Sequence, residues 1–413
     1  MKEFIKQARY RLMIFLAVFG PATITAVSDD DGAGVATYSL AGAKFGYSIL
    51  FILFVVTFLL AITQEMGVRI ALVTRKGLGD LIRERYGIIL SVVVFFILFI
   101  ANLGTIVSNF AALKATFQMF GLPVAPFLFL SVAFSIIIVS KGNYEVNQKI
   151  FLLAVVLYFS YVISAFKAKP DWSLAFKSLV VPTGIKLSKE FIFASIAVLG
   201  TTITPWGQFF VHSFVLDKKL SVDKLKFTQF ETYFGALFTD FFSFFMIVAT
   251  ASTLFVHNIP LTSGEQAALA IKPFAGELAG FLFGFGIINA ALMGIIIISL
   301  TTAYAFAEFF GYEGSLDAPF QKGRLFYGIF IFQVVAAALI VLLPFVSLFK
   351  IVFITQAMNG FLLPLIFFFL LKITNNKDLM GQHVNSKIYN YFAIISSVII
   401  IISSLFVLIS SFL

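Results

Sequence analysis

The chain has 413 residues, of which 60% are hydrophobic and only 12% are charged. Soluble domains are about 45–50% apolar and about 25% charged, so this composition excludes an ordinary soluble protein and leaves no room for a large soluble domain. The absence of cysteine excludes disulfides, iron–sulfur clusters and thiolate zinc sites. The net charge of +9 comes from basic residues in the connecting segments, which indicates membrane topology and contact with anionic lipid, with no nucleic-acid partner.

Apolar runs bounded by charges, proline or glycine predict eleven membrane-spanning helices in a single transmembrane domain, residues 1–413. The runs are continuous and do not alternate, so the predicted class is an all-α polytopic membrane protein. The predicted spans are 12–43, 46–72, 88–113, 122–140, 148–166, 191–216, 229–256, 275–307, 325–347, 350–372 and 389–412.

The first span contains three adjacent acidic residues, Asp29, Asp30 and Asp31, followed by Gly-Ala-Gly. Neighbouring residues point about 100° apart on a helix, so three carboxylates cannot share one face, and a helix break is predicted here. Carboxylate oxygens together with freed backbone carbonyls would suit a hard cation. The alternative is a loop outside the membrane, although each flank is too short to span alone.

The sixth span is interrupted near Pro205, which lies between Gly200 and Gly207. A simple proline kink is the alternative explanation. Two interrupted helices at matching positions favour an inverted-repeat transporter with its site at the membrane midplane. The predicted repeats cover 12–166 and 191–372, and an extra helix covers 389–412.

Further polar residues lie inside predicted spans. Gln356 and Asn359 lie about one turn apart in the tenth span, either as ion ligands or as helix–helix hydrogen-bonding groups. Structural partners are expected for Glu65 and Asp240. The third span carries a polar stripe without a titratable group, formed by Asn102, Thr105, Ser108 and Asn109.

The distribution of lysine and arginine predicts the orientation in the cell membrane. Alternate connections on the side of the N-terminus hold 20 of the 29 basic residues. Because basic loops stay in the cytoplasm, the N-terminus is predicted to be cytoplasmic. An odd number of spans then places the C-terminus outside the cell.

The two breaks resemble the Nramp family of divalent-metal transporters, in particular its bacterial magnesium-transporting branch. The likeness runs from GPATITAVSDDDGAGVATYSLAGAKFGY through VLGTTITPWGQFF to TQAMNGFLLPL. It implies a LeuT-like fold of two inverted five-helix repeats with an eleventh helix, and alternating access without any cofactor. The metal ligands that it implies are Asp31, Thr201, Thr204, Gln356 and Asn359, with Asp29, Asp30 and Gly34 as weaker candidates.

The chain departs from the family motifs at the site itself. The asparagine of the first-helix motif Asp-Pro-Gly-Asn becomes Gly34, and the methionine and histidine of the sixth-helix motif become Thr204 and Trp206. Loss of the soft thioether leaves an oxygen-only site, which favours Mg²⁺ and, second, Mn²⁺. Asn102 and Thr105 stand where coupled relatives carry acidic residues, so transport without proton coupling is expected.

Three other functions compete with this hypothesis. A proton-coupled Mn²⁺/Fe²⁺ symporter and a LeuT-fold carrier of amino acids or organic cations share the architecture. An intramembrane protease would use Gly77 to Asp80, which match GxGD, but no second aspartate pairs with it, and no enzyme activity is expected. The expected partners are the divalent ion and the lipid bilayer, with no obligate protein partner.

Overall fold

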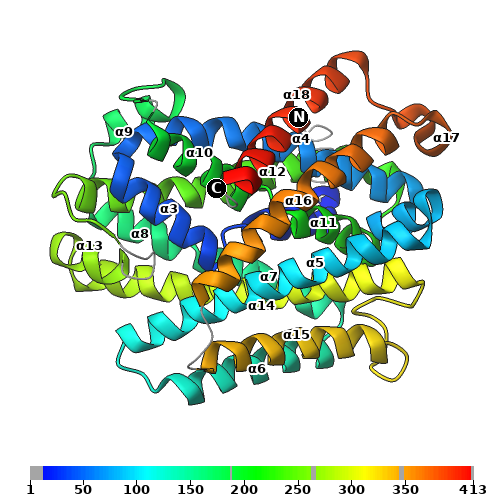
Figure 1. The fold of residues 1–413 in the computed structure, drawn as a ribbon, viewed down its shortest axis with the longest axis horizontal. Coiled ribbons are helices and arrows are strands. Elements are labelled where there is room, and N and C mark those ends of the chain that lie inside the picture. The colour runs from blue at the N-terminus through cyan, green and yellow to red at the C-terminus, as the bar shows by residue number, and fades with distance from the viewer. Residues whose placement is uncertain (1–12, 187, 262–266, 344–347, 411–413) are drawn as a thin grey trace, which may run out of the picture.

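A computed structural model describes residues 13–186, 188–261, 267–343 and 348–410, and this part of the chain is helical with no strand. Figure 1 shows the helices packed side by side in one bundle, with α14 along α5, and α15 along α6. The first half of the chain forms α2 (Pro21–Ser28), α3 (Gly32–Phe45), α4 (Leu50–Thr74), α5 (Leu78–Met119), α6 (Val124–Lys141), α7 (Tyr144–Leu157) and α8 (Phe159–Lys167). The second half forms α9 (Trp172–Val180), α10 (Lys189–Thr202), α11 (Pro205–Asp217), α12 (Leu225–Thr250), α13 (Ala267–Ala275), α14 (Glu277–Phe310), α15 (Arg324–Leu342), α16 (Leu348–Thr374), α17 (Lys377–Met380) and α18 (Lys387–Ser410).

Both predicted interruptions are confirmed. The first span is divided into α2 and α3, and the sixth into α10 and α11. The third span begins after a kink at Gly87, whose φ of 83° lies in the region that favours glycine.

Eight described helices are long and apolar enough to cross a membrane, or up to nine if the bent pair Met358–Thr374 and Lys377–His383 forms one span. This count takes α3 and α4 together as one segment, Gly32–Thr74, whereas α2, α10 and α11 are each too short to be included. The eleven-span count therefore stays a prediction. The ends of three predicted spans, at 12, 344–347 and 411–412, lie outside the described residues.

Close packing brings α2 against α12 in the centre of the bundle. A Cβ added to Gly235 would lie only 2.9 Å from the Cα of Thr23, so the two helices approach at a distance that only glycine permits. Glu231, one turn earlier on α12, accepts hydrogen bonds from the backbone N–H groups of Gly20 and Thr23 at 3.0 and 2.9 Å. These contacts fix the start of α2, because its first N–H groups have no partner inside the helix.

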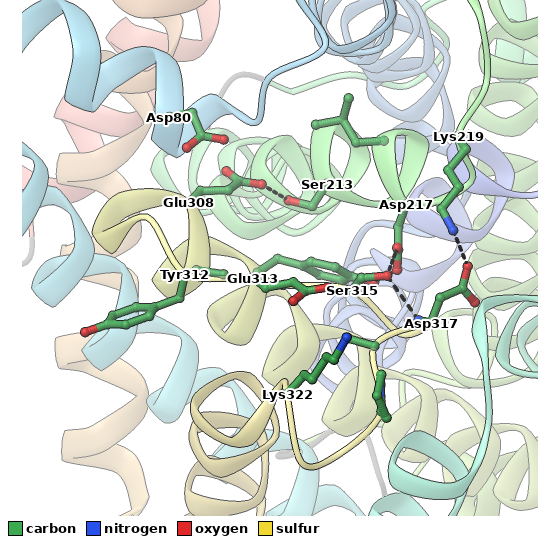
Figure 2. Close-up of a pocket in the computed structure, with 16 residues that line it drawn as sticks. Asp80, Ser213, Asp217, Lys219, Glu308, Tyr312, Glu313, Ser315, Asp317 and Lys322 are labelled. Atoms are coloured by element: carbon green, nitrogen blue, oxygen red, sulfur yellow. Dashed lines mark hydrogen bonds and ion pairs between the residues drawn. The ribbon is translucent and has the colours of Figure 1, made fainter.

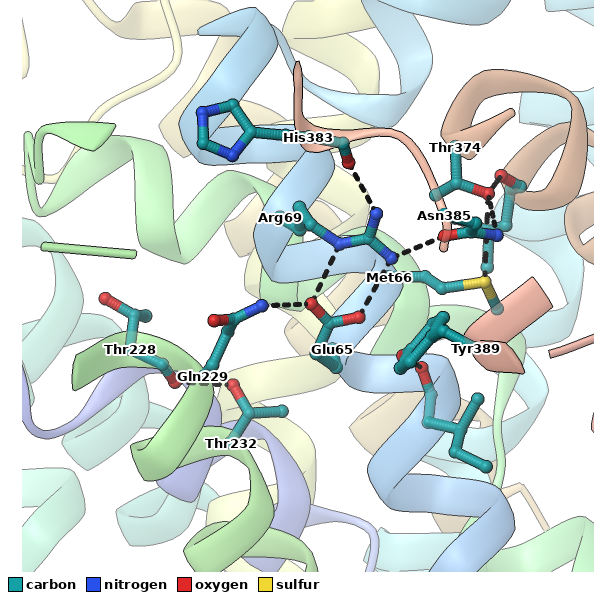
Figure 3. A network of polar contacts seen from close by, with 12 residues as sticks. Glu65, Met66, Arg69, Thr228, Gln229, Thr232, Thr374, His383, Asn385 and Tyr389 are labelled. Atoms are coloured by element: carbon teal, nitrogen blue, oxygen red, sulfur yellow. Dashed lines mark hydrogen bonds and ion pairs between the residues drawn. The ribbon is translucent and has the colours of Figure 1, made fainter. Parts of the chain in front are cut away.

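A buried ion pair anchors the segment before α18 to α4, as Figure 3 shows. Arg69 donates from Nε to Glu65 at 2.8 Å, and its other nitrogens bond the backbone oxygen of His383 at 2.7 Å and Asn385 Oδ1 at 2.6 Å. The Glu65 carboxylate also accepts from Gln229 of α12 at 2.7 Å. The prediction of a structural partner for Glu65 is confirmed.

Candidate metal-ion site at two helix breaks

The first break is formed by the three adjacent aspartates. Asp29, Asp30 and Asp31 are 2%, 0% and 4% exposed, so all three carboxylates are removed from the surface of the protein. Asp31 is the N-cap of α3, and its Oδ1 accepts from the backbone N–H of Gly34 at 2.8 Å. The acidic side chain thus satisfies one of the free N–H groups at the helix start.

The second break lies between Thr202 and Pro205. Thr204 is the N-cap of α11 and accepts from the backbone N–H of Gly207 at 3.1 Å, while Pro205 occupies the first helical position, where no N–H is needed. The hydroxyl of Thr202 lies 2.7 Å from that of Tyr38 on α3. The two interrupted helices are therefore linked directly.

The two breaks meet at Asp29 and Thr204. Thr204 Oγ1 donates to Asp29 Oδ1 at 2.8 Å. A Cβ added to Gly34 would lie 2.6 Å from the backbone oxygen of Asp29 and 3.4 Å from Thr201 Oγ1. These two oxygens therefore lie close to the Cα of Gly34, on the side where a side chain would project. We call Asp29, Gly34, Thr201 and Thr204 the break junction. Its side chains offer only oxygen atoms, the donor type that hard cations prefer.

The carboxylate of Asp30 faces away from the break junction. Its oxygens accept from Ser243 at 2.7 Å and from Thr239 at 3.1 Å, both on α12. Its backbone oxygen accepts from the hydroxyl of Tyr158 at 3.0 Å. With these bonds made, Asp30 fastens the break to α12 and to the end of α7.

Asp31 faces α5 and α14. Its Oδ2 accepts from Asn109 Nδ2 at 2.7 Å, and Asn109 Oδ1 accepts in turn from the backbone N–H of Gly32 at 2.8 Å. A Cβ added to Gly294 of α14 would lie 2.7 Å from the Cβ of Asp31, so glycine makes room for this side chain. The structure therefore places Asp29, rather than Asp31, against the sixth-helix break.

A cavity of about 280 Å³ adjoins the break junction. Thr37, Thr201 and Asn359 contribute polar atoms to its lining, and Ser403 and Ser404 of α18 add hydroxyls. The buried Asn359 Oδ1 has no hydrogen-bond partner among the described residues. The space can hold several water molecules beside these oxygens. Gln356 lies on the same helix as Asn359, but its side chain is outside the described part of the structure.

A second polar cavity, of about 440 Å³, lies between α11, α14 and the loop that follows α14 (Figure 2). Asp217 is held there by the hydroxyl of Tyr304 at 2.6 Å, the backbone N–H of Leu316 at 2.8 Å and the hydroxyl of Ser315. Glu308 accepts from Ser213 at 2.5 Å. Both carboxylates are satisfied by protein donors: Asp217 fastens the loop to α11, and Glu308 links α14 to α11.

Sequence reasoning missed several contacts of the aspartates. Asn109 was recognised only as part of a polar stripe, and its bond to Asp31 depends on how α3 and α5 pack. Thr239 and Ser243 are four residues apart and so share a helix face, which is the one signal that the sequence offers. For Asp240, neither carboxylate oxygen accepts a hydrogen bond among the described residues, and the Thr57 hydroxyl near it donates to the backbone oxygen of Leu53.

The described residues contain no group of three or more histidine, cysteine, aspartate or glutamate side chains arranged to hold a metal ion. The site therefore differs from the closed, all-side-chain cage of a resident metal. Two interrupted helices that meet at a buried polar junction, with a polar cavity beside it, define a membrane transporter of the interrupted-helix class.

Comparisons with known proteins identify the family. A family model described as natural resistance-associated macrophage protein-like, Nramp, matches residues 22–410, and the chain belongs to this family. It is a transporter and not an enzyme, and a transporter of this family carries no cofactor.

The chain is similar to a curated protein from Yersinia enterocolitica named divalent metal cation transporter MntH, with 24% identity over 96% of each chain. It is also similar to a solved structure of the Eremococcus coleocola manganese transporter, with a TM-score of 0.79, 18% identity and coverage of 96% of this chain and 87% of that one. Mhp1, a nucleobase-cation-symport-1 transporter, matches at a TM-score of 0.51 and 15% identity, over 95% and 91% of the two chains. The predicted LeuT-like fold is confirmed.

Proposed function

We propose that this protein transports divalent metal ions, with Mg²⁺ as its main substrate and Mn²⁺ as its second, by alternating access around the break junction. The observation that carries the proposal is the charge of the first break. Three adjacent carboxylates are buried there, and no lysine or arginine of the described residues pairs with any of them. Buried carboxylates are costly without an opposite charge, and a divalent ion supplies that charge.

The proposed ligands are the oxygens that the two breaks bring together. Asp29 and Thr204 lie in direct contact, and Thr201 flanks Gly34 beside the backbone oxygen of Asp29. Asn359 supplies an oxygen in the adjoining cavity that has no hydrogen-bond partner among the described residues. Asp31, which stands at the aspartate position of the family motif, is proposed to support the site without binding the ion directly. Its two oxygens accept hydrogen bonds from Asn109 and from the backbone N–H of Gly34.

The choice of Mg²⁺ follows from the chemistry of these ligands. Mg²⁺ accepts only oxygen donors and keeps several of its waters when bound. Threonine at 204 offers no sulfur, and glycine at 34 brings no side chain to the junction. Mn²⁺ also accepts oxygen ligands, and the related proteins named above for manganese and divalent metal cations support it as a substrate.

We also propose that transport is not coupled to protons. The polar stripe on α5 has no titratable side chain. Within it, Asn102 Nδ2 donates a hydrogen bond to Thr302 Oγ1 at 2.8 Å. A proton-coupled Mn²⁺/Fe²⁺ symporter is the second candidate, supported by the manganese transporter among the related structures. In either case, the proposed orientation has a cytoplasmic N-terminus and an extracellular C-terminus.

Ion flux into proteoliposomes tests this function. Mg²⁺ and Mn²⁺ uptake is measured for the wild type, Asp29→Asn, Asp31→Asn and the control Asp317→Asn, whose side chain lies in the loop after α14. We expect Asp29→Asn to abolish flux, Asp31→Asn to reduce it, and the control to leave it unchanged. Thermal stability of each purified variant separates a lost site from a lost fold.

Three results would contradict the proposal. Full Mg²⁺ and Mn²⁺ flux in a folded Asp29→Asn protein would remove the break junction as the site. Strong Cd²⁺ or Fe²⁺ uptake without Mg²⁺ uptake would refute the ion preference. Acidification inside the vesicles that depends on added metal would refute transport without protons.

A further inference from the structure

A second cavity in the membrane region carries a single acidic group. It has a volume of about 580 Å³ and lies between α4, α9 and α12; we call it the α4–α12 groove. Nearly all of the side chains that line it are aromatic or aliphatic, with Phe54 and Phe58 from α4, Phe176 from α9, and Leu237 and Phe241 from α12 among them. Asp240 of α12 is its one charged lining residue among those described.

Asp240 has no basic partner among the described residues, and the nearby hydroxyl of Thr57 donates to the backbone oxygen of Leu53 at 2.9 Å. Its side chain is 4% exposed, and neither carboxylate oxygen has a hydrogen-bond partner in the described part of the chain. The neighbouring hydroxyls on α12 do not serve it, because Thr239 and Ser243 both bond to Asp30. Burial of an ionised carboxylate without a partner is unfavourable, and an approaching cation offsets that cost. The groove is therefore complementary to a ligand with a positive charge.

The rest of the groove determines what kind of cation fits. A metal ion of the Mg²⁺ type requires about six oxygen ligands or bound waters, whereas the walls here are mostly hydrocarbon, and Thr57 and Tyr233 are the hydroxyl-bearing residues among the described lining. The rim residues Phe58, Leu237 and Phe176 are 56%, 64% and 55% exposed, and on the lipid-facing side of a membrane protein such side chains contact acyl chains. Aromatic walls attract an organic ammonium group through cation–π interactions.

We propose that the α4–α12 groove binds a hydrophobic organic cation, with its ammonium group at Asp240 and its apolar body between the aromatic side chains of α4 and α12. The lining of this site shares no described residue with the break junction. Thr239, which precedes Asp240 in sequence, and Ser243, three residues after it, both donate to Asp30 of the first break, so α12 links the two places.

Equilibrium binding of radiolabelled benzyltrimethylammonium to the full chain in lipid nanodiscs tests the proposal, with empty nanodiscs as the background. Neopentylbenzene is the uncharged carbon isostere of this probe and serves as the competitor. Asp240→Asn removes the charge with little change in shape, and Ala61→Phe fills the groove from α4. Asp317→Asn, an acidic residue outside the groove, is the matched control.

We expect saturable binding to the wild type and to the control. Both groove variants should bind at least about tenfold more weakly, which corresponds to about 1.4 kcal/mol. Neopentylbenzene should not displace the probe at equal concentration, and excess MgCl₂ should displace no more than KCl of the same ionic strength.

The proposal is overturned if binding does not exceed that of empty nanodiscs, or if a folded Asp240→Asn protein binds as tightly as the wild type. Displacement by Mg²⁺ beyond the KCl control would place the probe at the break junction and would also overturn it. Asp240→Asn changes the charge of the groove and Ala61→Phe changes its volume, so if one variant fails to fold, probe binding to the other still tests the proposal. Absence of Mg²⁺ and Mn²⁺ flux in a wild-type protein that binds the probe would refute the proposed function alone.

Discussion

Replacing Gly34 by alanine introduces a methyl group into the break junction. The added Cβ would lie 2.6 Å from the backbone oxygen of Asp29, which is 0.8 Å closer than the 3.4 Å at which ordinary contact begins. A backbone oxygen cannot rotate away as a side chain can, so the break must widen. Overpacking of this kind costs about 1–3 kcal/mol of folding free energy. We expect a lower thermal unfolding temperature and an increase of about tenfold in the KM for Mg²⁺.

Gly200→Ala is the matched control, because it lies in the other interrupted helix and lines the same cavity. No heavy atom lies within 4 Å of a Cβ added there. Alanine is favoured over glycine inside a helix by about 0.5–1 kcal/mol, so this variant should be at least as stable as the wild type, with an unchanged KM. Thermal unfolding and proteoliposome flux of both variants test the reasoning. Wild-type stability and KM in Gly34→Ala, or equal damage in Gly200→Ala, would refute it.

Three further predictions concern other contacts. Arg69→Leu leaves a buried carboxylate unpaired and should destabilise the protein by about 3–5 kcal/mol; an unfolding temperature equal to that of the wild type would contradict this. Asn109→Leu removes the partner of Asp31 and should cost about 1–3 kcal/mol and reduce Mg²⁺ flux; unchanged flux would show that this bond does not support the site. Lys219 lowers the pKa of Asp317 by a hydrogen bond and an ion pair, so their stabilisation is complete above the ordinary aspartate pKa and is lost as the pH falls through the lowered value. Asp317→Asn should therefore unfold at a slightly lower temperature than the wild type at neutral pH, and the difference should vanish in acid.

The sequence by itself determined the class of the protein and the places where its helices break. Continuous apolar runs can be satisfied only by helices in a membrane, because every backbone group there must be paired within its own segment. The breaks at Asp29 to Asp31 and at Thr204 were predictable for local reasons, since adjacent carboxylates cannot share a helix face and Pro205 cannot donate a backbone hydrogen bond. The order of the motifs along the chain also identified the family.

Only the tertiary structure decided which aspartate faces which partner. The three carboxylates are adjacent in sequence, and a non-helical backbone turns them toward different neighbours: Asp29 to Thr204, Asp30 to α12, and Asp31 to Asn109. Such directions depend on dihedral angles at the break and on contacts between residues more than 70 positions apart, which have no periodic pattern in the sequence. For the same reason, the sequence does not reveal that Asp240 receives no hydrogen bond from α12: Thr239 and Ser243 lie near it on that helix, but in the structure both donate to Asp30.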